Sequence, residues 1–355
     1  MYKPHIQQII SIWLIVSALL VLLMIVLGGI TRLTNSGLSI VEWNPVFGVI
    51  PPISFEDWNN EFNKYKSSPE FNLVNNQMTI SEFKFIFFIE YIHRLIGRVT
   101  GIIIIIPFLT FYYLQYLTKQ QCYRLLFIIY LVVVQGFMGW YMVKSGLKDN
   151  PYVSHYRLAG HFLLAVIIYH QLIIEILNII QPFKSSISTS AINKIISVNE
   201  SNLKAKLAFF NKIIILLLYV QVMFGALVAG LDAGLIYNEF PNMGNGLIPI
   251  ELLNQPMDFT VFDNSVVIQF IHRWFGILIG SLIICYATLL VILNRQIPSI
   301  IGVIAIFLIL VQITTGIITL VYHVPTLIAL IHQVCAILLL TIFFLIQNIS
   351  ANSTV

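Results

Sequence analysis

The chain has 355 residues, of which 58% are hydrophobic and 10% are charged, with a formal net charge of +4. Soluble domains carry about 25% charged residues, so this composition excludes a water-soluble globular protein. It gives no indication of a nucleic-acid partner, and it predicts an integral membrane protein.

Eight apolar stretches are long enough to cross a bilayer as helices. In chain order they lie near residues 9–29, 85–117, 122–143, 158–180, 208–230, 265–293, 298–321 and 325–347. The first is too long for a cleaved signal peptide and lacks a small-residue cleavage pattern after it. The sequence therefore predicts an all-α integral membrane fold with eight transmembrane helices.

Charged residues are unevenly distributed between the spans. The segment between the fourth and fifth spans is basic (Lys184, Lys194, Lys204, Lys206, Lys212), whereas most acidic residues fall in segments 30–82 and 231–264. The positive-inside rule then predicts that both termini are cytoplasmic and that the two long acidic loops face outward. The three cysteines, Cys122, Cys285 and Cys335, lie within or at the ends of apolar stretches, so no structural disulfide is expected.

The two halves of the chain resemble each other. EYIHRLIGRVTG (90–101) aligns without gaps on QFIHRWFGILIG (269–280), and VQ followed by small residues recurs at 134 and 311. GLSIVEW (37–43) similarly matches GLIYNEF (234–240). This order predicts two tandem, pseudo-symmetric four-helix bundles, 1–181 and 208–355, joined by a cytoplasmic linker, 182–207.

Four histidines lie about two turns inside the same end of their spans: His93, His161, His272 and His332. A polar side chain at membrane depth is costly unless it is bound, and it is a functional candidate by default. Two histidines per predicted bundle indicate two bis-histidine sites, for which haem is the favoured ligand. Zinc would require imidazoles clustered with thiolates or carboxylates, and only Glu90 offers one.

One difference between the halves concerns an acid. Glu90 lies three residues before His93 and shares its helix face, whereas the matching residue before His272 is Gln269. The first half thus has an acid/base group beside its expected iron site. Arg94, Arg98 and Arg273 follow the histidines, where they could bind haem propionates or extend to lipid headgroups.

Taken together, GGITRLTNSGLSIVEWNPVFGVIPP (28–52), EYIHRLIGR (90–98), SHYRLAGH (154–161), FIHRWFG (270–276) and ALIHQ (329–333) resemble the haem A synthase family over nearly the whole chain. The resemblance implies a bacterial inner-membrane enzyme that oxidises the C8 methyl group of haem O to a formyl group by successive hydroxylations. It implies that His272 and His332 ligate a haem b iron and that His93 and His161 flank the iron of the substrate haem O. It also implies that Glu90 is needed for activity. No cysteine pair lies in the first outer loop, as in the proteobacterial and mitochondrial branch of the family.

Two other functions explain the four histidines: a diheme b-type electron carrier, and a membrane haem transporter or chaperone. The enzyme would receive haem O from haem O synthase, the protohaem farnesyltransferase, and would pass electrons to a membrane acceptor. The oligomeric state is left open, a homo-oligomer included.

Overall fold

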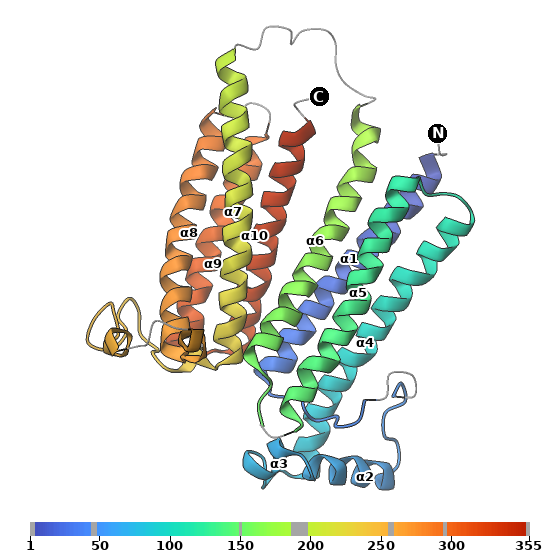
Figure 1. Ribbon diagram of the computed structural model, residues 1–355, viewed down its shortest axis with the longest axis vertical. Helices are drawn as coiled ribbons and strands as arrows, with labels where there is room; N and C mark the ends of the chain where they lie inside the picture. Colours follow the sequence, from blue (N-terminus) through green and yellow to red (C-terminus); the bar gives the residue numbers. More distant parts are fainter. Residues whose placement is uncertain are drawn as a thin grey trace. The chain divides into compact units, whose positions relative to one another are not determined.

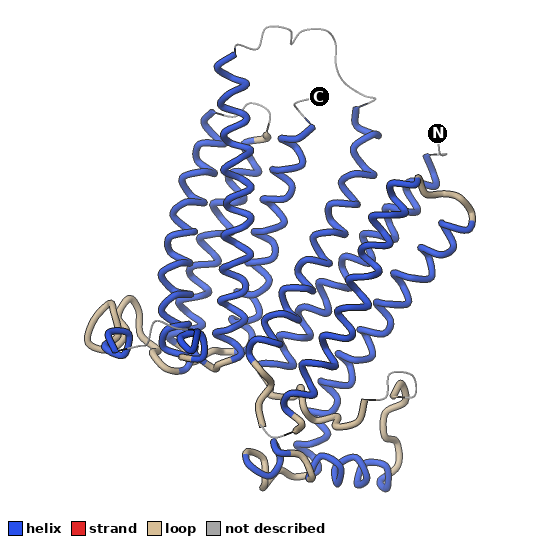
Figure 2. Tube along the Cα trace, viewed as in Figure 1, coloured by secondary structure: helices blue, strands red, loops and turns tan. Residues whose placement is uncertain are grey.

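The computed structural model describes residues 4–43, 48–148, 151–185, 198–254, 259–293 and 297–352. These residues form helices and loops, and none of them belongs to a strand (Figure 2). Eight helices in the described ranges are long and apolar enough to cross a membrane, which confirms the prediction of eight spans. Residues 186–197 of the predicted linker lie outside the described residues. The chain separates into two compact units, Met1–Leu172 and Ile173–Val355.

The first unit contains the long helices α1 (Pro4–Leu33), α4 (Ile80–Tyr113), α5 (Lys119–Gly146) and α6 (His155–Ser185), which runs on past the unit boundary (Figure 1). Helix α1 packs along α4, and the Trp13 indole N–H donates to the Ile103 carbonyl at 2.7 Å. Helices α4 and α5 each begin at a capping box, formed by Thr79 with Glu82 and by Thr118 with Gln121. These caps satisfy backbone donors that would otherwise lack partners at the first turn.

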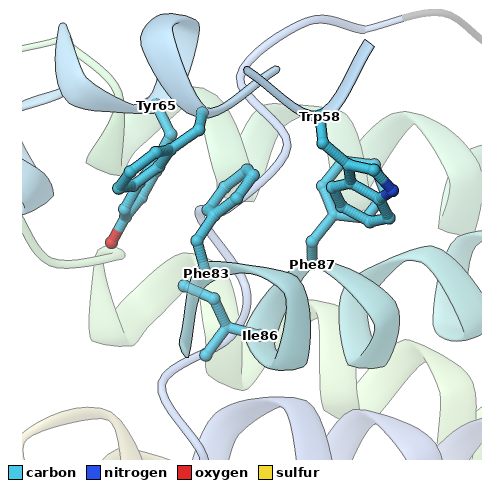
Figure 3. Packing of buried hydrophobic residues seen from close by; sticks show 6 residues of the cluster. Trp58, Tyr65, Phe83, Ile86 and Phe87 are labelled. Atoms are coloured by element: carbon cyan, nitrogen blue, oxygen red, sulfur yellow. The ribbon is translucent and has the colours of Figure 1, made fainter. Parts of the chain in front are cut away.

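Segments 30–82 and 231–264 are called the outer segments after the side of the membrane predicted for them. The sequence predicts a loop over 30–82, but this segment contains two further helices, α2 (Phe55–Lys66) and α3 (Pro69–Leu73). Helix α2 begins at a capping box of Ser54 and Asp57, and it places an aromatic face on the N-terminal end of α4. The cluster comprises Trp58, Phe62 and Tyr65 from α2 and Phe83, Ile86 and Phe87 from α4 (Figure 3). This packing holds the acidic outer segment against the start of the second membrane span.

The second unit is a four-helix bundle of α7 (Val198–Gly230), α8 (Ser265–Leu293), α9 (Ser299–Val321) and α10 (Thr326–Asn352) (Figure 1). Helix α7 packs on α8 and α10, and α9 packs on the same two helices, so the bundle closes. Short 3-10 helices η1 (Ala233–Leu235), η2 (Ile250–Asn254) and η3 (Phe259–Asp263) lie between α7 and α8. The Asn211 amide joins α7 to α10 by donating to the Phe343 carbonyl at 3.0 Å.

Candidate functional site

In the second unit, the imidazoles of His272 on α8 and His332 on α10 face each other inside the bundle. Their ring centres are 6.4 Å apart, and the ring planes cross at 76°. Two metal–imidazole bonds of about 2 Å each, with half a ring on either side, span about 6 Å between ring centres. The separation therefore suits a single iron held between the two imidazoles. Among the described residues, no three His, Cys, Asp or Glu side chains gather in one place.

Glycines on the neighbouring helices make room for these rings. A Cβ atom at Gly316 on α9 would lie 2.8 Å from His332 Cε1, and one at Gly225 on α7 would lie 3.1 Å from His272 Cε1. Real Cβ atoms essentially never approach as close as the first distance. The bundle therefore requires glycine at 316 for this imidazole to keep its position.

Hydrogen bonds to the same neighbouring helices fix the imidazole orientations. His332 Nδ1 lies 3.0 Å from the Gln312 carbonyl oxygen, to which an Nδ1 hydrogen can donate. His272 Nδ1 lies 3.1 Å from the side-chain amide of Gln221, which also donates to the His272 carbonyl at 2.9 Å. For His332, a hydrogen on Nδ1 leaves Nε2 as the nitrogen for a metal, as second-shell contacts do in known metal sites, and the Gln312 amide lies 3.2 Å from that Nε2 atom. For His272, the same assignment requires the Gln221 amide to present its oxygen to Nδ1.

The first unit contains His93 on α4 and His161 on α6. Each again lies against a glycine of a neighbouring helix. A Cβ atom at Gly28 on α1 would lie 3.6 Å from His93 Nε2, and one at Gly139 on α5 would lie 3.1 Å from His161 Cε1. The amide of Gln135 lies 3.3 Å from His161 Nε2 and donates to the His161 carbonyl at 3.1 Å.

Glu90 is 2% exposed, and all of its hydrogen-bond partners are donors. Its Oε2 atom accepts from the Ser39 hydroxyl at 2.7 Å and from the Ile40 backbone N–H at 2.9 Å. Its Oε1 atom pairs with the Arg94 guanidinium at 2.5 Å. Arg94 also donates to the carbonyls of Ile40 and Glu42, so the pair fastens the chain after α1 onto α4.

The second unit has the same arrangement without the carboxylate. Gln269 is also 2% exposed, and its amide donates to the Tyr237 carbonyl at 3.1 Å. Arg273 donates to that same carbonyl, and to the carbonyl of Glu239 at 3.0 Å. Both arginines thus fasten an outer segment to a helix, but only the first lies beside a buried negative charge.

A second buried carboxyl lies in the outer segment of the first unit. The Tyr65 hydroxyl donates to Glu70 Oε2 at 3.0 Å, and the Asn75 amide donates to the Tyr65 oxygen at 2.8 Å. Burial raises the pKa of Glu70 to about 7 against the effect of the Tyr65 hydrogen bond, and the Glu90 carboxylate adds to the rise. Burial likewise raises the pKa of Tyr65. This carboxyl therefore changes its charge near neutral pH.

The model of a family of cytochrome oxidase assembly proteins, COX15-CtaA, matches residues 11–344 of the chain. The chain belongs to this family. It is 74% identical over 355 residues to a Heme A synthase of Orientia tsutsugamushi (strain Ikeda), with 99% of both chains covered. It is 44% identical over 346 residues to a Heme A synthase of Rickettsia felis, which covers 96% of this chain and 99% of the relative. A Heme A synthase of Rickettsia massiliae is 46% identical over 353 residues, with the same coverage.

In this member of the COX15-CtaA family, the structure brings His272 together with His332, and Glu90 together with Arg94. Arg98 lies one turn beyond Arg94 on α4 and is half-buried. The binding of propionates by Arg94, Arg98 and Arg273 remains a prediction, as does iron ligation by the four histidines.

Four polar residues that contact the histidines and Glu90 were not predicted from the sequence. These are Gln135, Gln221, Gln312 and Ser39. A signal for two of them was present in the repeated VQ of the third and seventh spans, to which no role was given. The Glu90–Arg94 pair also has the i, i+4 spacing of helical ion pairs.

Proposed function

We propose that this protein is a haem A synthase, an oxidoreductase that converts the C8 methyl group of haem O to a formyl group. Its family and the names of its full-length relatives support this function. The observation on which the proposal depends is the difference between the two units: each has a histidine pair, but the buried carboxylate Glu90 belongs to one and the neutral Gln269 to the other. A pure electron carrier has no need of that difference.

The second unit is the proposed site of haem b, held by His272 and His332. The 6.4 Å between the ring centres and the glycine at 316 support this assignment. When bound there, haem b supplies a carrier for electrons that leave the substrate site. Gln269 places no charge beside this site, which suits a cofactor that only exchanges electrons.

The first unit is the proposed site of the substrate, with haem O between His93 and His161. Two hydroxylations of the methyl group give a gem-diol, which loses water to give the formyl group. With oxygen atoms from water, the two hydroxylations release four protons and four electrons, and the electrons pass to the proposed membrane acceptor. Glu90 holds a negative charge near the site, and the Ser39 hydroxyl, 2.7 Å from Oε2, can exchange a proton with it. Arg94 keeps the carboxylate in place by pairing with Oε1.

The proposed location is the bacterial inner membrane, with both termini in the cytoplasm. An even number of spans supports having both termini on one side. Haem O synthase is the proposed source of the substrate, and a membrane electron acceptor is the proposed destination of the electrons.

We also propose that the two halves of the chain, 1–181 and 208–355, are repeats of one ancestral bundle joined by the linker 182–207. Equivalent contacts support this: Arg94 donates to the carbonyls of Ile40 and Glu42, and Arg273 donates to those of Tyr237 and Glu239. Both carbonyl pairs have the same spacing and occupy matching places in the sequence repeat.

Extraction of haems from the purified protein tests the proposed function. Protein produced with a supply of haem O is expected to contain haem b together with haem O or haem A. His272→Ala and His332→Ala should each lose the low-spin haem b spectrum, whereas the control His155→Ala should keep it. Two permanently bound haems b would instead identify an electron carrier, and a single loosely exchanging haem would identify a transporter.

A further inference from the structure

The four helices that precede the histidine helices share one pattern. Each has a glycine against a histidine ring, and each has a long side chain four residues before that glycine. The pairs are Met24 with Gly28 on α1, Gln135 with Gly139 on α5, Gln221 with Gly225 on α7, and Gln312 with Gly316 on α9. Because residues at i and i+4 lie on one face of a helix, the long side chain meets the same histidine helix as the glycine.

In three of these helices the long side chain is a glutamine that reaches the histidine ring. The Nε2 atoms of Gln135, Gln221 and Gln312 lie 3.3 Å from His161 Nε2, 3.1 Å from His272 Nδ1 and 3.2 Å from His332 Nε2, respectively. The Oε1 atom of each glutamine is buried without a hydrogen-bond partner. A side-chain amide can present its oxygen instead of its nitrogen, so each glutamine can also accept a hydrogen from the imidazole. Gln135 and Gln221 then give up the bond from Nε2 to the backbone carbonyl of the histidine.

The exception is Met24. Its Cε atom lies 3.4 Å from the Cβ position of Gly97, one turn after His93. Gln221 occupies the corresponding place, with its Nε2 atom 2.8 Å from the Cβ position of Gly276, one turn after His272. Within the described part of the chain, no side-chain hydrogen bond holds the His93 imidazole, whereas His272 is held through Nδ1.

A ligating histidine whose second nitrogen is hydrogen-bonded is fixed in orientation and is a stronger ligand. A thioether cannot donate a hydrogen bond and accepts one only weakly. We infer that the residue beside the first histidine of each unit determines how tightly that unit retains its haem. This residue is Met24 in the first unit and Gln221 in the second. Gln221 positions His272 for a resident haem, and Met24 leaves His93 as an exchangeable ligand, so that the product haem can leave. This inference rests on the proposed function, because it takes haem b as resident and haem O as substrate.

Exchanging the two side chains tests the inference by haem retention and midpoint potential. Purified Gln221→Met protein should transfer haem b to apomyoglobin at least about tenfold faster than wild type, the lower end of second-shell effects on metal affinity. Met24→Gln protein should release haem O and haem A about tenfold more slowly. The carboxylate of Gln221→Glu can still accept a hydrogen bond from His272 Nδ1. This variant should therefore keep haem b, and the midpoint potential of that haem should be lower than in wild type.

Met24→Leu is the matched control, because it changes the packing without adding a hydrogen-bonding group, and it should release haem at the wild-type rate. Wild-type release rates in either Gln221→Met or Met24→Gln would overturn the inference. His272→Ala distinguishes this failure from that of the proposed function. If His272→Ala loses haem b while Gln221→Met keeps it, the inference alone fails; if His272→Ala keeps haem b, the ligand assignment fails.

Discussion

Replacing Gly316 with alanine should displace His332 and release haem b without unfolding the protein. The new Cβ atom would lie 2.8 Å from His332 Cε1, whereas ordinary contacts begin at 3.4 Å. The imidazole must therefore move by about 0.6 Å, the difference between these distances. Metal–ligand distances vary by only about 0.2 Å, so a ring displaced by this amount would no longer hold the iron.

The energies indicate that the fold survives this change. Overpacking of this kind costs about 1–3 kcal/mol, and alanine in a helix interior regains about 1 kcal/mol relative to glycine. We therefore expect Gly316→Ala protein to be produced at near wild-type levels but with a lost or high-spin haem b spectrum. Gly136→Ala is the control, because a Cβ atom there meets nothing within 4 Å. An unchanged low-spin spectrum in Gly316→Ala would refute the reasoning.

Two further predictions concern the first unit. His93→Ala and His161→Ala should abolish haem A formation while leaving most of the haem b, as measured by haem extraction; full activity in either variant would remove that residue from the site. The pKa of Glu70 is raised from 4.5 to about 7. Between these two pH values the folded outer segment therefore retains a proton that the unfolded chain releases. Its stability should be greatest below about pH 4.5 and fall by up to about 3 kcal/mol as the pH rises to 7. Hydrogen exchange over Phe55–Leu73 measures this change, and a pH dependence that persists in Glu70→Gln would assign it to another group.

The sequence alone predicted the eight spans because each depends only on a long local run of apolar residues. It did not predict α2, which is polar in composition and buries only Trp58, Phe62 and Tyr65 on one face. The capping box at Ser54 and the spacing of these aromatic residues were usable signals for a helix.

The site was predictable to a different degree. The four histidines could be found because each lies in an apolar stretch where a polar residue is conspicuous. The contacts of Gln221 with His272 and of Ser39 with Glu90 could not be predicted, because they join segments that are distant in the chain and depend on how the helices pack. The sequence predicts that Arg94 binds a propionate or reaches the lipid headgroups, which stays a prediction. The pairing of Arg94 with Glu90, which its position one turn later allows, was not predicted.

The central claim is that chemistry belongs to the unit with Glu90, and haem extraction from Glu90→Gln membranes tests it most directly. The substitution copies Gln269, so the outer segment should still be fastened and haem b should still bind. Loss of the negative charge should stall the oxidation, so the account predicts little haem A and an accumulation of haem O or of a hydroxymethyl intermediate. A wild-type yield of haem A from Glu90→Gln would contradict the account and leave Glu90 as a residue that only fastens the outer segment to α4.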